Sequence, residues 1–256
     1  MAISYEKKDH IAIVTINRPH KMNCLDLNDK DELGRVWLDF RDDDNLWVGI
    51  LTGAGEKAFC SGGDLRNLIP KVNSGETTIL PTEAGFLKNI KCFKPIVAAV
   101  NGVCLAGGME MLQGTDIRIA VEEATFGLPE VKWAIFPGAG STVRLPHQIP
   151  FCRAMEILLL GEFVTANEAL QMGFINKVVR REELMTVAVG IAEKLCKNGP
   201  LALKAIKESV LKSFIMNEEH AYFLEAFLAN QVFGTEDAIE GVNAFSEKRK
   251  PLYSGK

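Results

Sequence analysis

The chain has 256 residues, enough for one compact domain with an appendage, and its 47% hydrophobic and 24% charged content is typical of a globular protein. Its 29 basic and 33 acidic residues give a formal charge of −4 without any block of like charges, which argues against a nucleic-acid partner. No apolar run has the length of a membrane span or a signal peptide. We therefore expect a cytoplasmic or organelle-matrix protein.

The first half of the chain alternates predicted strands and helices. Continuous apolar runs bounded by glycine predict strands that are buried on both faces, and such strands are typical of parallel sheets. The predicted strands are residues 10–18, 46–53, 94–102, 117–120 and 125–127. Helices are predicted at 28–43, with Asn28 or Asp29 as its cap, and at about 107–114. The polar stretch 66–85 is expected to be a loop or a short helix.

The last third of the chain is almost purely helical in its apolar pattern. Helices are predicted at 182–197, 201–214, 218–233 and 236–249. Their broad apolar faces carry several phenylalanines, among them Phe214, Phe223, Phe227 and Phe233. These faces fit either packing on the protein's own core or a subunit interface.

Several common functional patterns are weak or missing. The six cysteines form no C-x-x-C pair and the four histidines lack metal-ligand spacing, so we expect no metal site. G-x-G-x-x-A occurs at Gly53, Gly55 and Ala58, but no helix pattern begins there and no acidic residue ends a following strand, which argues against a dinucleotide fold. Ser61 lacks the G-x-S-x-G context of a serine hydrolase.

Two segments share a buried strand, a short connection and paired glycines that open a helix. The first pair is Gly62 and Gly63, and the second is Gly107 and Gly108. Glycine lets a ligand approach bare backbone amides, and the first amides of a helix are unpaired and lie at the positive end of its dipole. Two such amides that converge would stabilise an oxyanion, although each pair alone also fits a tight packing turn.

Two glutamates follow these glycine-rich segments in apolar surroundings. Glu110 lies three residues after Gly107, and Glu130 follows the rigid Pro129. A buried carboxylate must be paired, solvated or functional, because its desolvation is costly. Each could be a structural ion pair, but together they suit acid–base chemistry that moves a proton at carbon while handling a water.

At these residues the sequence resembles the crotonase (enoyl-CoA hydratase/isomerase) superfamily over nearly its whole length. The matching segments are NRPHKMNCL (17–25), AFCSGGDL (58–65), VNGVCLAGGMEML (100–112), FGLPEVKWAIFPGAGSTVRLP (126–146) and AFSEKRKP (244–251). The resemblance implies an α/β spiral of strand–helix repeats, with the acyl-CoA site in residues 1–195 and a helical trimerisation region in 196–256. It also implies a homotrimer or a hexamer built from two trimers, and no cofactor besides the coenzyme A of the substrate.

The resemblance assigns roles to individual residues. It places the oxyanion hole at the amides of Gly63 and Gly107, the water-activating acid at Glu110, and the acid that exchanges the α-carbon proton at Glu130. Valine at either glycine should then harm catalysis more than stability. Positions that match the coenzyme A groove are Lys21, Met22, Ala58, Cys60, Ser61, Gly62, Asp64 and Leu65, together with Lys248, which would reach a phosphate, often from a neighbouring subunit.

Keeping both acids favours reversible hydration of a 2-enoyl-CoA, since family members with other activities usually lack one of them. Other reactions of the superfamily stay open, namely isomerisation, decarboxylation and carbon–carbon cleavage, as does a non-catalytic binding role. The segments FRDDDNLWVGILTGAGEKAF and TEDAIEGVNAFSEKRKP also resemble carnitinyl-CoA dehydratase-like members. Met109, Met111, Trp133 and Phe136 depart from the common pattern near the acyl pocket, which leaves the acyl chain and the direction of the reaction open.

Overall fold

The structure, a computed structural model, describes residues 1–78, 80 and 82–256 and contains two sheets. The larger sheet has the order β1-β2-β3-β5-β7-β10, and the smaller has the order β4-β6-β8-β9. All pairings in these sheets are parallel except β1–β2 and β8–β9, which confirms the predicted α/β class with mainly parallel strands. The strand bounds are β1 Ile3–Lys8, β2 Ile11–Ile16, β3 Val48–Gly53, β4 Ala58–Cys60, β5 Ile96–Val100, β6 Val103–Leu105, β7 Ile117–Val121, β8 Thr125–Gly127, β9 Phe163–Thr165 and β10 Lys177–Val179.

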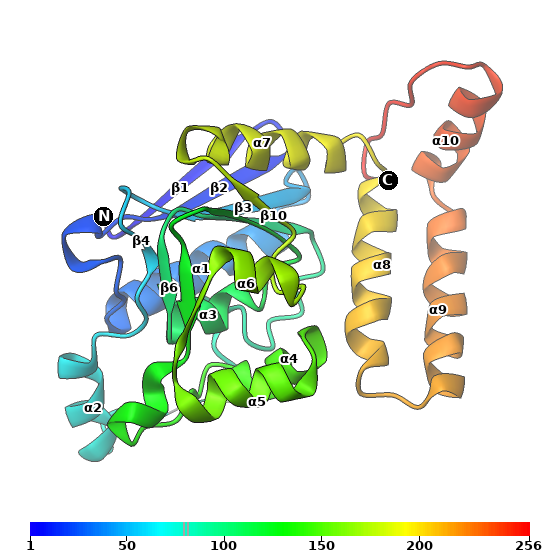
Figure 1. The fold of residues 1–256 in the computed structure, drawn as a ribbon. Helices are drawn as coiled ribbons and strands as arrows, with labels where there is room; N and C mark the ends of the chain where they lie inside the picture. The colour runs from blue at the N-terminus through cyan, green and yellow to red at the C-terminus, as the bar shows by residue number, and fades with distance from the viewer. Residues whose placement is uncertain (79, 81) are drawn as a thin grey trace.

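Helices cover both faces of the larger sheet (Figure 1). Every residue of β3 and β5 is buried, as their unbroken apolar runs predict. On one face α1 (Leu27–Asp42) inserts Trp37 and Phe40, both fully buried, and the Phe40 ring lies against Gly49 of β3. On the other face α7 (Leu184–Leu195) contacts β3, β5 and β7. The main core therefore lies between these helices and the central strands.

Helix α1 begins earlier than predicted. Its N-cap is Asp26, whose carboxylate accepts a hydrogen bond from the amide of Asp29, while the Asp29 carboxylate accepts one from the amide of Asp26. The prediction of Asn28 or Asp29 as the cap is wrong, because this reciprocal capping box gives Asp29 the third position of the helix instead. Arg18 contacts both carboxylates and fixes the start of the helix.

The polar stretch 66–85 contains a short helix, as predicted. Helix α2 (Leu65–Asn73) is capped by Asp64, and the 3-10 turn η2 (Ala84–Phe86) follows. Two short elements carry the predicted acids. Helix α3 (Gly107–Leu112) begins at the second glycine pair and contains Glu110, and the 3-10 turn η3 (Pro129–Trp133) contains Glu130. The chain then continues through α4 (Ser141–Gln148), α5 (Phe151–Leu160) and α6 (Ala166–Gln171).

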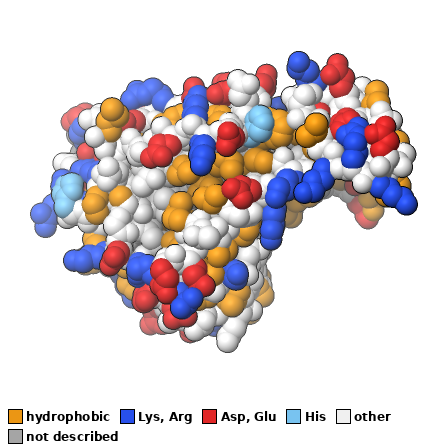
Figure 2. Space-filling view, turned by 90° about the horizontal axis from the view of Figure 1, so that it is seen from above, with side chains coloured by type: hydrophobic (Ala, Val, Ile, Leu, Met, Phe, Trp, Pro, Cys, Tyr) orange, Lys and Arg blue, Asp and Glu red, His pale blue; other side chains and the backbone are white. Residues whose placement is uncertain are grey.

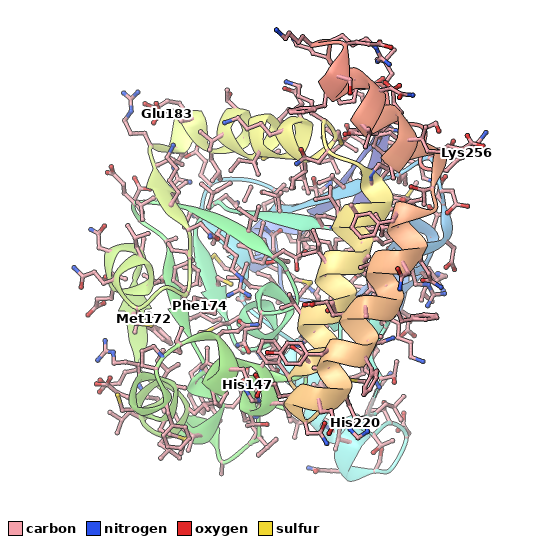
Figure 3. The ribbon with its side chains drawn as sticks, turned by 90° about the vertical axis from the view of Figure 1, so that its right-hand side faces the viewer. His147, Met172, Phe174, Glu183, His220 and Lys256 are labelled. Carbon is pink, nitrogen blue, oxygen red and sulfur yellow. The ribbon has the colours of Figure 1, made fainter. Side chains whose placement is uncertain are left out.

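Three C-terminal helices stand apart from the sheets (Figure 1). They are α8 (Pro200–Ser213), α9 (Glu218–Phe233) and α10 (Glu236–Ser246), and α8 and α9 run side by side (Figure 3). Lys207 ties α8 to the body through Asp116 and the carbonyl of Lys94. Acidic and basic side chains are interspersed over the face seen in Figure 2. In the described part of the chain, no helix is long and apolar enough to cross a membrane.

Candidate active site

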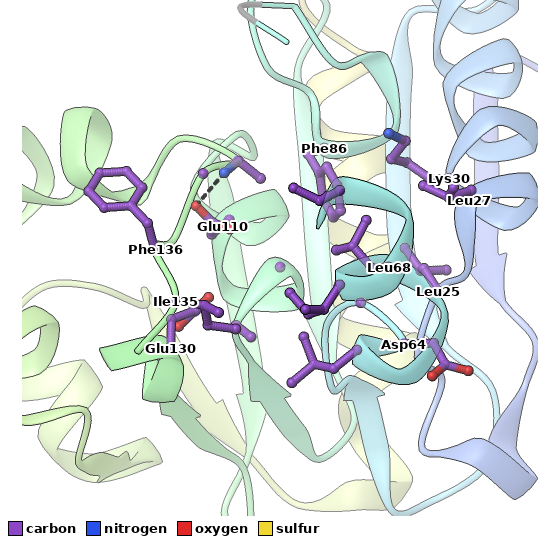
Figure 4. Close-up of a pocket in the computed structure, with 18 of the residues that line it drawn as sticks. Leu25, Leu27, Lys30, Asp64, Leu68, Phe86, Glu110, Glu130, Ile135 and Phe136 are labelled. Carbon is purple, nitrogen blue, oxygen red and sulfur yellow. Dashed lines mark hydrogen bonds between the residues drawn. The ribbon is translucent and has the colours of Figure 1, made fainter. Parts of the chain in front are cut away.

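A cavity of about 480 Å³ lies between the start of α1, helix α2, turn η2, helix α3 and turn η3 (Figure 4). Its volume falls in the range of small-molecule sites, and its wall is mostly apolar with a few convergent polar groups. The predicted site residues Gly63, Gly107, Glu110 and Glu130 all line this one cavity. Segments that are distant in the sequence therefore meet at a single site.

The two glycine-rich turns lie against each other. A Cβ atom on Gly62 would lie 3.1 Å from the amide nitrogen of Gly107, and Gly62 has a φ of +98° that favours glycine. In the described residues, neither the amide of Gly63 nor that of Gly107 donates a hydrogen bond to a protein acceptor. Ala106 takes a φ of +50° as the N-cap of α3, a strained conformation for a residue with a side chain, and it turns this helix start toward the first glycine turn.

Glu110 is buried in the cavity wall, and backbone amides hold its carboxylate. Oε1 accepts hydrogen bonds from the amides of Ala139 at 2.8 Å and Ser141 at 3.1 Å, and one dashed line in Figure 4 marks a hydrogen bond of this carboxylate. Burial raises the pKa of this carboxyl, and the amides offset part of that rise because they favour the ionised form. Gly140, with a φ of +127°, allows the turn that aims both amides at one oxygen.

Glu130 is also buried but has a poorer set of partners. Its Oε2 atom is fully buried and has no hydrogen-bond partner in the described residues. Burial, with a further contribution from the nearby Glu110 charge, raises the pKa of Glu130 to about 7. The cavity thus holds two carboxyls whose pKa values are both raised by burial, but only that of Glu110 is lowered in part by hydrogen bonds from the amides of Ala139 and Ser141.

The residues predicted for the coenzyme A groove fall into three groups. Ser61, Asp64 and Leu65 line the cavity beside Gly63. Ala58, Cys60 and Gly62 are buried behind this wall, and burial raises the pKa of the Cys60 thiol to about 12. Lys21 and Met22 lie at and just after the 3-10 turn η1 (Pro19–Lys21), whereas Lys248 follows α10 at the far end of the chain. Their role in binding coenzyme A stays a prediction.

Several wall residues were missed from the sequence. Leu68, Ile69 and Val72 of α2 line the cavity, and their helical spacing was a usable signal within a stretch described only as polar. The Ala139 and Ser141 amides were also missed, although a P-G-A-G segment before a helix could have indicated them. Lys30 and Glu83, which pair across the wall, gave no signal because they are far apart in the sequence.

Comparisons with known proteins agree with this architecture. Residues 6–256 match the family described as enoyl-CoA hydratase/isomerase. The chain is 39% identical over 255 residues to (E)-benzylidenesuccinyl-CoA hydratase of Thauera aromatica, covering 100% of each chain. It is 38% identical over 251 residues to carnitinyl-CoA dehydratase of Escherichia coli, covering 95% of this chain and 94% of the relative.

The solved structures agree as well. A crystal structure of enoyl-CoA hydratase from Bacillus anthracis superposes with a TM-score of 0.93 at 36% identity and covers 100% of both chains. The predicted resemblance and the crotonase fold are thereby confirmed. The chain belongs to the enoyl-CoA hydratase/isomerase family of enzymes.

Proposed function

We propose that this protein reversibly hydrates a 2-enoyl-CoA to a 3-hydroxyacyl-CoA. The observation that carries the proposal is the meeting of two unpaired glycine amides and two buried carboxylates at one apolar cavity. Amides placed at Gly63 and Gly107 suit the thioester oxygen, which gains negative charge as the enolate forms. Relatives named as hydratase and as dehydratase fit the two directions of the same reaction.

The two acids have separate roles in this mechanism. Glu110, whose ionised form is favoured by hydrogen bonds from the amides of Ala139 and Ser141, takes a proton from water while the water oxygen bonds to the β-carbon. Glu130 gives its proton to the α-carbon as the enolate collapses. Hydration therefore ends with the proton on Glu110 and none on Glu130. Dehydration starts from that state, so both directions use a pair that carries one proton.

This shared proton predicts a bell-shaped pH profile of kcat/KM. Raising the pH through about 7 removes the Glu130 proton and should lower kcat/KM, whereas lowering the pH protonates Glu110 and should also lower it. Because hydration consumes no net proton, the profiles of hydration and dehydration should have the same two limbs. The measurement is initial rates of both directions, corrected for alkaline thioester hydrolysis. A profile that is flat between pH 5 and pH 9 would contradict the assignment.

The test of the proposed function is the incubation of purified protein with crotonyl-CoA. Hydration removes the conjugated thioester, so its ultraviolet absorbance should fall and 3-hydroxybutyryl-CoA should form. A protein that leaves 2-enoyl-CoAs unchanged but moves the double bond of a 3-enoyl-CoA would instead be an isomerase. Inactivity on both thioesters, together with coenzyme A binding, would favour a non-catalytic binding role.

We also propose that the C-terminal helices form subunit contacts in a trimer or a hexamer. Large apolar side chains are exposed on these helices in the isolated chain, and such area is typical of interfaces. They include Ile206, Val210, Phe223, Phe227, Phe233, Ile239, Val242 and Phe245. An assembly could bring Lys248 to the coenzyme A of a neighbouring subunit. Light scattering should give a mass of three or six chains, and a monomer at micromolar concentration would contradict the proposal.

A further inference from the structure

One cation lines the same cavity as the two acids. Lys30 of α1 is the only lysine or arginine among the described residues that line it. Figure 4 shows its side chain beside Phe86 and Leu27, across the cavity from Glu110 and Glu130. Its Nζ atom lies 3.2 Å from Oε1 of Glu83, which is also part of the wall. A charged pair in a mostly apolar wall is costly to bury, so a ligand group that uses the charge would explain its presence there.

The ammonium group of Lys30 has hydrogen-bond donors that the pair with Glu83 does not use. An ammonium group has three N–H donors, and in the described residues Lys30 uses one of them, toward Glu83. The Glu83 side chain is only 4% exposed and has a second lysine, Lys88, 4.0 Å from its other oxygen. Lys88 itself donates to the carbonyls of Leu80 and Gly138. Lys30, whose side chain is 19% exposed, can thus donate further hydrogen bonds to a ligand in the cavity.

The charges immediately next to Lys30 favour an anion at this point. Lys30, Lys88 and Glu83 together carry a net charge of +1, and a ligand cation would have to compete with two lysines for the covered Glu83 carboxylate. The other acids of the wall have their own partners, apart from Glu130, which is readily protonated near neutral pH. These partners are Arg18 for Asp26, the Arg66 amide for Asp64, and the amides of Ala139 and Ser141 for Glu110.

We infer that the acyl group of the substrate carries a carboxylate, which binds Lys30, at the end of an apolar spacer. This inference rests on the proposed enoyl-CoA hydratase function. The spacer would cross the apolar wall formed by Leu27, Leu68, Val72 and Phe86, while the thioester lies at the glycine amides. A carboxylate accepts charge-assisted hydrogen bonds from an ammonium, and such bonds are stronger where the bound ligand displaces water from the site.

The test compares two 2-enoyl-CoA thioesters of equal carbon number, one ending in a methyl group and the other in a carboxylate. Wild-type protein should hydrate the carboxylate-ended thioester with a kcat/KM about 10-fold higher or more, the range of a hydrogen bond to a charged group. Lys30→Met should lower kcat/KM for that thioester by about 10-fold or more while changing the value for the methyl-ended one by less than about 3-fold.

Two matched variants separate a local contact from a general effect of charge. Lys88→Met removes the same charge from the neighbourhood but not from the cavity wall, so the preference for the carboxylate should fall less than in Lys30→Met. Glu83→Gln releases Lys30 from its partner and should keep or raise the preference. Equal losses in Lys30→Met and Lys88→Met would overturn the contact with Lys30.

The outcomes also separate this inference from the proposed function. Hydration of neither thioester, nor of crotonyl-CoA, would refute the hydratase assignment itself. Hydration of the methyl-ended thioester at an equal or higher efficiency would refute only the carboxylate inference, as would a preference for a trimethylammonium-ended thioester. If Lys30→Met does not fold, because the pair also joins α1 to η2, the wild-type preference still decides whether the substrate carries a carboxylate, and a lower preference in Glu83→Gln would contradict the contact with Lys30.

Discussion

Glu110→Gln should lower kcat/KM for hydration by about 10²-fold to 10⁴-fold, the range in which general acid–base groups contribute. Glutamine has nearly the same shape, and its carbonyl oxygen can still accept the hydrogen bonds from the amides of Ala139 and Ser141. It cannot, however, take a proton from water. The fold should therefore survive while the chemical step fails. The measurement is steady-state hydration of crotonyl-CoA together with the melting temperature of the variant.

Glu130→Gln is the matched comparison for this variant. It should lose activity in the same range, but its melting temperature above pH 7 should stay equal or rise, because glutamine removes a carboxyl whose ionised form is disfavoured by burial. Binding of coenzyme A, measured by calorimetry, should be retained in both variants, since neither change touches the groove predicted for it. Glu110→Gln protein that keeps more than a tenth of the wild-type kcat/KM would show that the water-activating role is misassigned.

The sequence predicted the framework because buried strands carry a local signal. The unbroken apolar runs of β3 and β5 and the helical spacing of α7–α9 depend on neighbouring residues alone, and the structure places these elements where they were expected. The cap of α1 was misplaced because Asp26, Asn28 and Asp29 are all good capping residues. Only the reciprocal bonds of the capping box distinguish Asp26 from the others.

The cavity wall was less accessible to sequence reasoning. The Lys30–Glu83 pair joins residues that are 53 positions apart, and no sequence periodicity links helix α1 to Glu83 at the start of turn η2. The same holds for Glu110, which receives its hydrogen bonds from Ala139 and Ser141. Sequence motifs locate the residues that carry chemistry, but the groups that set their charge come from contacts between distant segments.

Gly108→Ala should destabilise the protein far more than Gly63→Ala, although both glycines belong to the predicted oxyanion turns. A Cβ on Gly108 would lie 2.2 Å from the carbonyl oxygen of Cys60, so the end of β4 would have to move. Overpacking of this kind costs about 3 kcal/mol or more when backbone is displaced, which corresponds to a fall in melting temperature of roughly 6–12 °C for a chain of this size. Activity should fall with it, because β4 leads into the Gly63 turn.

Gly63→Ala is the control within the same site. The nearest atom to a Cβ at this position is Leu68 Cδ2 at 3.5 Å, an ordinary contact, and φ is not positive, so the melting temperature should change little. At Gly107 a Cβ would lie 2.9 Å from the Phe86 ring, so the ring would have to shift to admit a larger residue, and valine there should cost stability as well as catalysis. Thermal unfolding of the alanine variants decides the matter. A melting temperature of Gly108→Ala within about 2 °C of wild type would correspond to at most about 1 kcal/mol. It would contradict the close packing of Gly108 against the carbonyl of Cys60.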